Sequence, residues 1–116
     1  IAKLAAGAKT LGNVICAEGG ASLGKMPGGT AWKARYDAKY PGQFQVYSPY
    51  TYDATMLLVD AMKRANSVDP KVYLPELAKS NFKGVTANIS FEKTGEMKNP
   101  AITLYNYIDG KKTPLN

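Results

Sequence analysis

The sequence contains no histidine and a single cysteine, Cys16. Without histidine, the chain lacks the commonest general acid–base group and any mixed cysteine–histidine metal site. One cysteine cannot form an internal disulfide, and a nucleophilic thiol would need a neighbouring base that histidine cannot supply here. Ile15 and Ala17 flank Cys16, which indicates a small, buried apolar residue. We therefore expect no catalytic residues, no metal site and no cofactor, so that the protein is not an enzyme.

Long apolar runs and clustered charges are also missing. No apolar run approaches the roughly 20 residues that cross a bilayer as a helix. The chain carries 15 Lys and Arg residues against 9 Asp and Glu residues, a net charge of +6, but its longest cationic runs are the pairs Lys63-Arg64 and Lys111-Lys112. A nucleic-acid surface would need basic residues gathered around aromatic ones. The positive charge therefore indicates a well-solvated surface, and we expect no nucleic-acid partner.

The length of 116 residues, with 45% hydrophobic and 21% charged residues, is typical of one globular domain or part of a larger one. The chain starts at Ile1, with no basic stretch ahead of an apolar segment, so it shows no signal peptide. Residues 1–6 have the composition of a helix end. We therefore expect the chain to be a piece of a longer protein.

One long helix, predicted from about Tyr47 to Ala65, organises the chain. Ser48 is predicted as its N-cap and Pro49 as its first helical residue, where the missing N–H of proline costs nothing. Asp53 lies near the positive end of the helix dipole, which is favourable for a carboxylate. Residues 56–59 are all apolar, which predicts a core helix with little exposed surface. Along its narrow polar edge, Asp60 and Arg64 are four residues apart and are expected to pair.

Hydrophobic spacing and turn residues predict the other elements. They are a helix tail at 2–9, a buried parallel strand at 13–17, a helix at 30–40, a strand at 44–47, a turn at 70–73, a helix at 75–80, a half-buried strand at 85–91, a strand at 102–107, a hairpin turn at 109–110 and a returning strand at 111–115. In the 30–40 helix, Trp32, Tyr36 and Tyr40 share one stripe, which we interpret as a packing face. Asp69-Pro70 is a cap and helix start, and Pro75 is expected to prevent a single helix there.

Four segments follow one another in a specific order and spacing. They are Tyr50-Thr51-Tyr52-Asp53-Ala54 at the start of the long helix, Asp69-Pro70 with Tyr73-Leu74-Pro75-Glu76-Leu77, Lys83-Gly84-Val85-Thr86 before Ile89-Ser90-Phe91-Glu92, and Ile102-Thr103-Leu104-Tyr105 before Asp109-Gly110-Lys111. Together these segments resemble the C-terminal part of the periplasmic branched-chain amino-acid (Leu/Ile/Val) binding proteins of ABC transporters. No single segment is diagnostic, but the series spans nearly the whole chain.

The resemblance implies an α/β architecture, a partial type I periplasmic-binding-protein fold that contains parts of both lobes and ends in a strand-rich C-terminal segment. It places residues 1–47 in the second lobe, residues 48–98 in the first lobe and residues 99–116 back in the second lobe. Most of the first lobe and of the ligand's contacts in this family lie outside the chain. We therefore expect the chain alone to bind ligand poorly and to associate with itself through the long helix.

The resemblance also implies a function. The complete protein would be periplasmic, would capture an amino acid or a similar small solute by hinge closure, and would deliver it to the permease of an ABC importer. A ligand-sensing domain of a receptor or transcriptional regulator with the same fold is the alternative. The tyrosine-rich start of the long helix favours an aromatic or polar ligand over a plain aliphatic one.

Four residues are candidates for ligand contact. Tyr47 matches a cleft-facing aromatic position of the family, and Tyr50 and Tyr52 are second choices. A tyrosine at a helix start also commonly packs inward with its hydroxyl on a backbone carbonyl, so this alternative stays open. Glu18 follows the predicted 13–17 strand at its C-terminal end, where ligands of open α/β sheets bind, although a carboxylate there is more often simply solvated.

Overall fold

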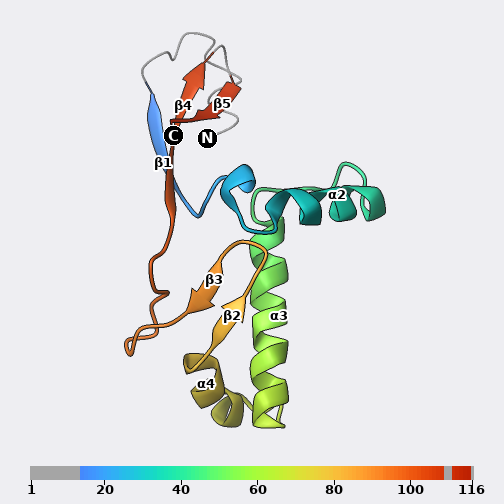
Figure 1. Cartoon of the computed structure of the whole chain (residues 1–116), viewed down its shortest axis with the longest axis vertical. Helices are drawn as coiled ribbons and strands as arrows, with labels where there is room; N and C mark the ends of the chain where they lie inside the picture. Colours follow the sequence, from blue (N-terminus) through green and yellow to red (C-terminus); the bar gives the residue numbers. More distant parts are fainter. Residues whose placement is uncertain (1–13, 109–110, 116) are drawn as a thin grey trace. The chain divides into compact units, whose positions relative to one another are not determined.

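A computed structural model describes residues 14–108 and 111–115 of the chain. The elements in order are β1 (Ile15–Gly19), the short 3-10 helix η1 (Leu23–Lys25), α2 (Gly29–Lys39), α3 (Ser48–Ala65), α4 (Pro70–Ala78), β2 (Asn81–Lys83), β3 (Asn88–Ser90), β4 (Ile102–Ile108) and β5 (Lys111–Pro114) (Figure 1). The described residues up to Ser22 and from Pro100 onward form one compact unit, the strand unit. Residues 23–99 form the other, the helical unit.

The strand unit is a three-stranded antiparallel sheet in the order β1-β4-β5. Cys16 lies opposite Tyr105, and Tyr107 lies opposite Lys112. The prediction of a buried parallel strand at 13–17 was therefore wrong in direction. Burial alternates along β1, so only one of its faces is covered, whereas a parallel strand is normally buried on both. The predicted strand at 102–107 and its return from residue 111 are confirmed, while the turn at 109–110 and the helix tail at 2–9 lie outside the described residues.

The long helix α3 begins and ends almost as predicted, but its environment differs. Its N-cap is Tyr47, without a side-chain cap bond, so the prediction for Ser48 was wrong; the Ser48 hydroxyl instead accepts a bond from the Gln45 N–H at 2.9 Å. Pro49 lies in the first turn as expected, and Asn66 ends the helix in the left-handed conformation common at this position.

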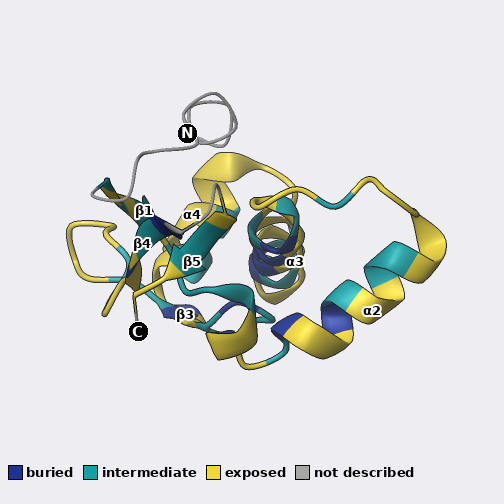
Figure 2. Ribbon diagram, turned by 90° about the horizontal axis from the view of Figure 1, so that it is seen from above, coloured by how far each residue is buried: buried dark blue, intermediate teal, exposed yellow. Residues whose placement is uncertain are grey.

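Only one stripe of α3 is buried. Asp53, Leu57 and Ala61 follow one another at four-residue intervals and are buried. Figure 2 shows α3 nearly end-on, with its buried residues in dark blue. Met56 and Val59 are exposed. The prediction that α3 is a core helix with little exposed surface was therefore wrong for this chain. The reason is that few elements of the helical unit lie against α3.

The helix α4 begins at Asp69-Pro70 as predicted, and the Asp69 carboxylate accepts a bond from the Lys71 N–H at 2.9 Å. Contrary to the prediction, Pro75 lies inside a single helix rather than separating a turn from a second helix. The carbonyl that loses a partner at Pro75 is that of Lys71, four residues earlier. Lys71 is exposed, so water can satisfy its carbonyl.

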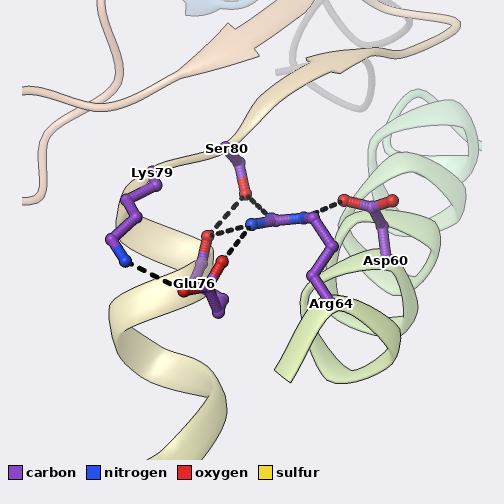
Figure 3. Close-up of polar contacts among 5 residues, drawn as sticks. All are labelled: Asp60, Arg64, Glu76, Lys79 and Ser80. Atoms are coloured by element: carbon purple, nitrogen blue, oxygen red, sulfur yellow. Dashed lines mark hydrogen bonds and ion pairs between the residues drawn. The ribbon is translucent and has the colours of Figure 1, made fainter. Parts of the chain in front are cut away.

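Arg64 joins α3 to α4 (Figure 3). Its guanidinium donates to Asp60, as the spacing predicted, and also to the Glu76 carboxylate at 2.9 Å and the Ser80 hydroxyl at 2.7 Å. The Lys79 ammonium beside Glu76 and, secondarily, the Arg64 guanidinium hold the pKa of the Glu76 carboxyl below its ordinary value.

Two strand predictions in the helical unit were wrong. Residues 44–47 are not a strand, since no neighbouring strand pairs with them, and Phe44 instead packs edge-on against Tyr36. Of the predicted strand at 85–91 only β3 is formed; it pairs antiparallel with β2, which the sequence analysis missed. Val85 and Thr86 leave the strand pattern because their N–H groups bond to a helix side chain, as described below.

Candidate functional site

A groove of about 650 Å³ lies between α2 and α3 within the helical unit. Aromatic side chains dominate its lining, and we name it the aromatic groove. From α2 and its C-cap it is lined by Trp32, Arg35, Tyr36, Lys39 and Tyr40; from the N-cap and first turns of α3 it is lined by Tyr47, Ser48, Thr51, Tyr52, Thr55 and Met56. The volume is in the range of small-molecule sites, which usually combine apolar walls with a few polar groups.

Three aromatic rings follow one another along α2 and its C-cap, the first two stacked and the third tilted. Trp32 and Tyr36 have centroids 4.8 Å apart at 27°, and Tyr36 and Tyr40 follow at 5.2 Å. Their four-residue spacing brings them to one face of the helix, as the sequence predicted. Trp32 also meets Tyr52 of α3 at 5.6 Å. The stripe is thus a packing face, and the same rings also line the groove.

The charged groups of the groove are both cationic. Arg35 and Lys39 line it, and none of the described residues contributes a carboxylate to the lining. Lys39 lies over the Tyr40 ring at 5.4 Å. The Arg35 guanidinium makes no ion pair or hydrogen bond with any residue in the described part of the chain. The Asp37 carboxylate on α2 is paired with Lys33, so it does not offset the charge of Arg35.

Two of the four predicted ligand residues line the aromatic groove. Tyr47 is 64% exposed and Tyr52 43% exposed, so both rings keep uncovered surface. Tyr50 is half-buried, with its ring 6.2 Å from that of Tyr47, and does not line the groove. Glu18 lies in the strand unit and is paired with Lys112. Ligand contact by these four residues stays a prediction.

The Lys112 ammonium that pairs with Glu18 also lies 4.0 Å from the centre of the Tyr105 ring. Glu18 is therefore paired rather than simply solvated, and a cationic ligand there would compete with Lys112. Its partner is far away in the sequence and becomes visible only once the β1-β4-β5 register is known.

Asp53 has a structural role that the sequence analysis missed. Its carboxylate is 1% exposed and accepts bonds from the N–H groups of Val85 at 2.8 Å and Thr86 at 2.7 Å, and from the Thr86 hydroxyl at 2.6 Å. The Val85 carbonyl in turn accepts a bond from the Gly28 N–H, just before α2, at 3.0 Å. A helix-dipole effect is therefore not the main role of Asp53. Its four-residue spacing from Leu57 and Ala61 was the available signal, since it places a carboxylate on the buried stripe.

Residues 20–24 read Gly-Ala-Ser-Leu-Gly, which matches the Gly-x-Ser-x-Gly pattern of some hydrolases. In those enzymes the serine lies on a sharp turn between a strand and an α-helix, beside a histidine base. Here β1 is followed by a single 3-10 turn, and the chain has no histidine. The pattern therefore lacks both the structural context and the base that a nucleophilic serine needs.

Among residues 14–108 and 111–115, no helix is both long and apolar enough to cross a membrane. The same residues contain no cluster of three or more His, Cys, Asp or Glu side chains that could hold a metal ion.

Comparison with known proteins identifies the family. A family model described as "Periplasmic binding protein" matches residues 2–111, nearly the whole chain. The chain belongs to the periplasmic binding protein family. This confirms the resemblance inferred from the four sequence segments.

A solved relative of the periplasmic binding protein family shows the same fold. It is the leucine-binding protein LivK from Thermotoga maritima, with a TM-score of 0.74 and 21% sequence identity. The alignment covers 91% of this chain but only 31% of LivK, so the chain has part of the type I periplasmic binding fold. No curated protein matches the chain by sequence.

Proposed function

We propose that this chain is part of a solute-binding protein that captures an amino acid or a similar small solute by hinge closure in the periplasm and delivers it to the permease of an ABC importer. The family and the LivK-like fold support a solute-binding role. The chain spans only 31% of LivK, so the complete site would include residues outside it. Binding without chemistry agrees with the absence of histidine from the chain.

The observation that carries this proposal is the aromatic groove, which places Tyr47 and Tyr52 at the start of α3 with uncovered ring surface. Exposed rings on the wall of a small-molecule-sized groove can cover the apolar part of a solute, while their hydroxyls reach a polar one. Closure would follow because contacts made to both lobes favour the closed state.

The proposed lobes are residues 1–47 with 99–116, and residues 48–98. The compact units change at Ser22 to Leu23 and at Asn99 to Pro100. The two divisions thus treat α2 differently: it belongs to the helical unit together with α3, although it precedes residue 48. A compact unit of this chain is not in itself a lobe of the complete protein, so the lobe assignment stays a prediction.

A thermal-shift panel of amino acids, amides and small carboxylates tests the proposed function on a longer protein that contains this chain. A solute that binds only the folded state raises the melting temperature, and at 100 times its Kd it adds about 2.7 kcal/mol of stability. Tyr47→Ala should reduce the shift, because it removes an exposed ring of the groove. Val68→Ala, at an exposed apolar position outside the groove, should leave it unchanged. The absence of a shift with every solute would contradict a solute-binding role.

A further inference from the structure

We propose that the aromatic groove takes a ligand that carries both an aromatic ring and a carboxylate, with the Arg35 guanidinium as the contact for the carboxylate. The inference rests on the proposed solute-binding function and specifies the chemistry of its ligand. It concerns a different group of the site from the tyrosines, because Arg35 is not among the four residues that the sequence singled out as candidates for ligand contact.

The ring part of the proposal follows from uncovered aromatic surface on both walls. On the α2 side the Tyr40 ring, which is exposed, packs at a tilt against Tyr36, and Tyr36 stacks on Trp32. On the α3 side Tyr47 and Tyr52 are exposed in the same groove. Aromatic rings favour offset or edge contacts with another ring, at centroid separations of about 4.5–7 Å. A flat ring placed between these walls can make such contacts with both helices.

The carboxylate part follows from the charge of the groove. Arg35 lines the aromatic groove and also the smaller adjoining cavity of about 250 Å³, so its side chain lies at the junction of the two. The carboxylates of its own helix and of the start of α3 are already engaged, Asp37 by Lys33 and Asp53 by the 85–86 backbone. Arg35 therefore keeps its full bonding capacity, and its planar fork matches a carboxylate.

The same lining argues against a zwitterionic aliphatic amino acid as the ligand held by this groove. Among the described residues, the lining offers an ammonium group no carboxylate to pair with, and two cations that repel it. A free acid lacks the ammonium and meets only favourable charge. A ring provides the contact area that a short aliphatic chain would leave unused.

Trp32 makes the test direct, because it is the only tryptophan in the chain and it lines the groove. The 116-residue chain is titrated with 3-phenylpropanoate while Trp32 fluorescence is recorded, and circular dichroism checks that each variant is folded. We expect a saturable change with 3-phenylpropanoate and binding about five- to tenfold weaker for its neutral amide, as the loss of one charge-assisted contact on a partly solvated arginine implies. An aliphatic acid, 4-methylpentanoate, should also bind more weakly.

Matched variants assign the effect to Arg35. Arg35→Gln should weaken 3-phenylpropanoate binding about five- to tenfold and leave the amide unaffected, and Arg35→Lys should restore part of the loss. Lys25→Gln removes one exposed cation of the helical unit that does not line the groove, so it should have no effect. Equal binding of acid and amide, or an Arg35→Gln variant that binds like the parent, would overturn the proposal.

The result also separates this inference from the proposed function. If the longer protein is stabilised by a solute but neither it nor the folded 116-residue chain responds to 3-phenylpropanoate, only the ligand class is wrong. If neither protein responds to any solute, both proposals fail. A fluorescence change that depends on protein concentration rather than on added acid would place a second copy of the chain in the groove and also overturn the inference.

Discussion

The substitution Gly84→Ala probes the contact between α3 and the loop at residues 84–86. A Cβ atom at Gly84 would lie 2.4 Å from Oδ2 and 2.8 Å from Cγ of Asp53, and 3.0 Å from the carbonyl oxygen of Ala87. The Asp53 carboxylate cannot simply turn away, because Oδ2 accepts bonds from both the N–H and the hydroxyl of Thr86, and Oδ1 accepts the Val85 N–H. Relieving the clash must therefore break or lengthen bonds to a buried charge.

The expected loss is about 2–4 kcal/mol in the free energy of unfolding. A loss of this size is expected for breaking one or two hydrogen bonds to a charged group, and also for moderate overpacking. The two costs are not added together, because both arise from the same displacement of Asp53. Denaturant unfolding followed by Trp32 fluorescence reports on the helical unit. Gly24→Ala is the matched control: a Cβ there meets nothing within 4 Å, so its effect should stay within about 0.5 kcal/mol.

A double-mutant cycle identifies the cause of the loss. Asp53→Ala removes the carboxylate that the new methyl group would meet, so adding Gly84→Ala to Asp53→Ala should cost far less than adding it to the parent. Additive effects of the two substitutions would show that Gly84→Ala acts through the backbone or through Ala87 instead. A loss for Gly84→Ala no larger than that for Gly24→Ala would refute the reasoning from the start.

Two further predictions concern exposed parts of the helical unit. Because Lys79 and then Arg64 lower the pKa of Glu76 in the folded chain, ionised Glu76 stabilises the fold above its unfolded pKa, and this contribution is lost as the pH falls through the folded pKa. Glu76→Gln should therefore flatten the acid side of a melting-temperature profile measured from pH 7 to pH 3; a profile as steep as that of the parent would contradict this. The exposed apolar residues of α3 should make the 116-residue chain associate with itself, so sedimentation equilibrium should give a mass that rises with concentration, and Leu58→Lys should reduce the rise. A monodisperse monomer at high concentration would exclude self-association through this surface.

Local signals in the sequence were sufficient where neighbouring residues decide the structure. The pairing of Asp60 with Arg64, the capping by Asp69 and the aromatic stripe that starts at Trp32 all depend on positions within one or two helical turns. Such contacts are fixed by the 3.6-residue period and by capping chemistry, so they could be predicted without knowing what packs against the helix.

The predictions that failed depended on partners far away in the sequence. The antiparallel direction of β1 is set by its pairing with β4. The paired residues Glu18 and Thr103 are 85 positions apart in the sequence. The start of the predicted 85–91 strand is lost because Val85 and Thr86 bond to Asp53, more than 30 residues earlier. The exposure of Val59 depends on which elements pack against α3. The hydrophobic pattern predicts that burial of this face is favourable, but it does not show whether this chain contains the residues that would bury it.

The candidate site shows the same difference between local patterns and distant partners, and only its tyrosines could be found from the sequence. Tyr47 and Tyr52 stood out as a local cluster, whereas the cationic wall of the groove could be recognised only when Asp37 and Asp53 were seen to be engaged elsewhere. Arg35 is unremarkable in the sequence because a lone arginine on a helix is usually solvated. Arg35 matters in the proposed site because none of the described residues offers it a free carboxylate. A sequence pattern does not reveal such an absence.

The buried contact at Asp53 and the exposed rings of the groove belong to one arrangement. Tyr52 and Asp53 are adjacent in α3, so one side chain lines the groove while the next holds the Val85 peptide. The carbonyl of that same residue accepts the Gly28 N–H at the start of α2. The Val85 backbone therefore bonds both to α3 and to the residue just before α2. The separation of the two helices thus depends on these bonds as well as on the exposed rings of the groove. It follows that Asp53→Ala should alter ligand binding in the groove without touching a ligand, whereas Tyr47→Ala should alter binding and leave the helix arrangement intact.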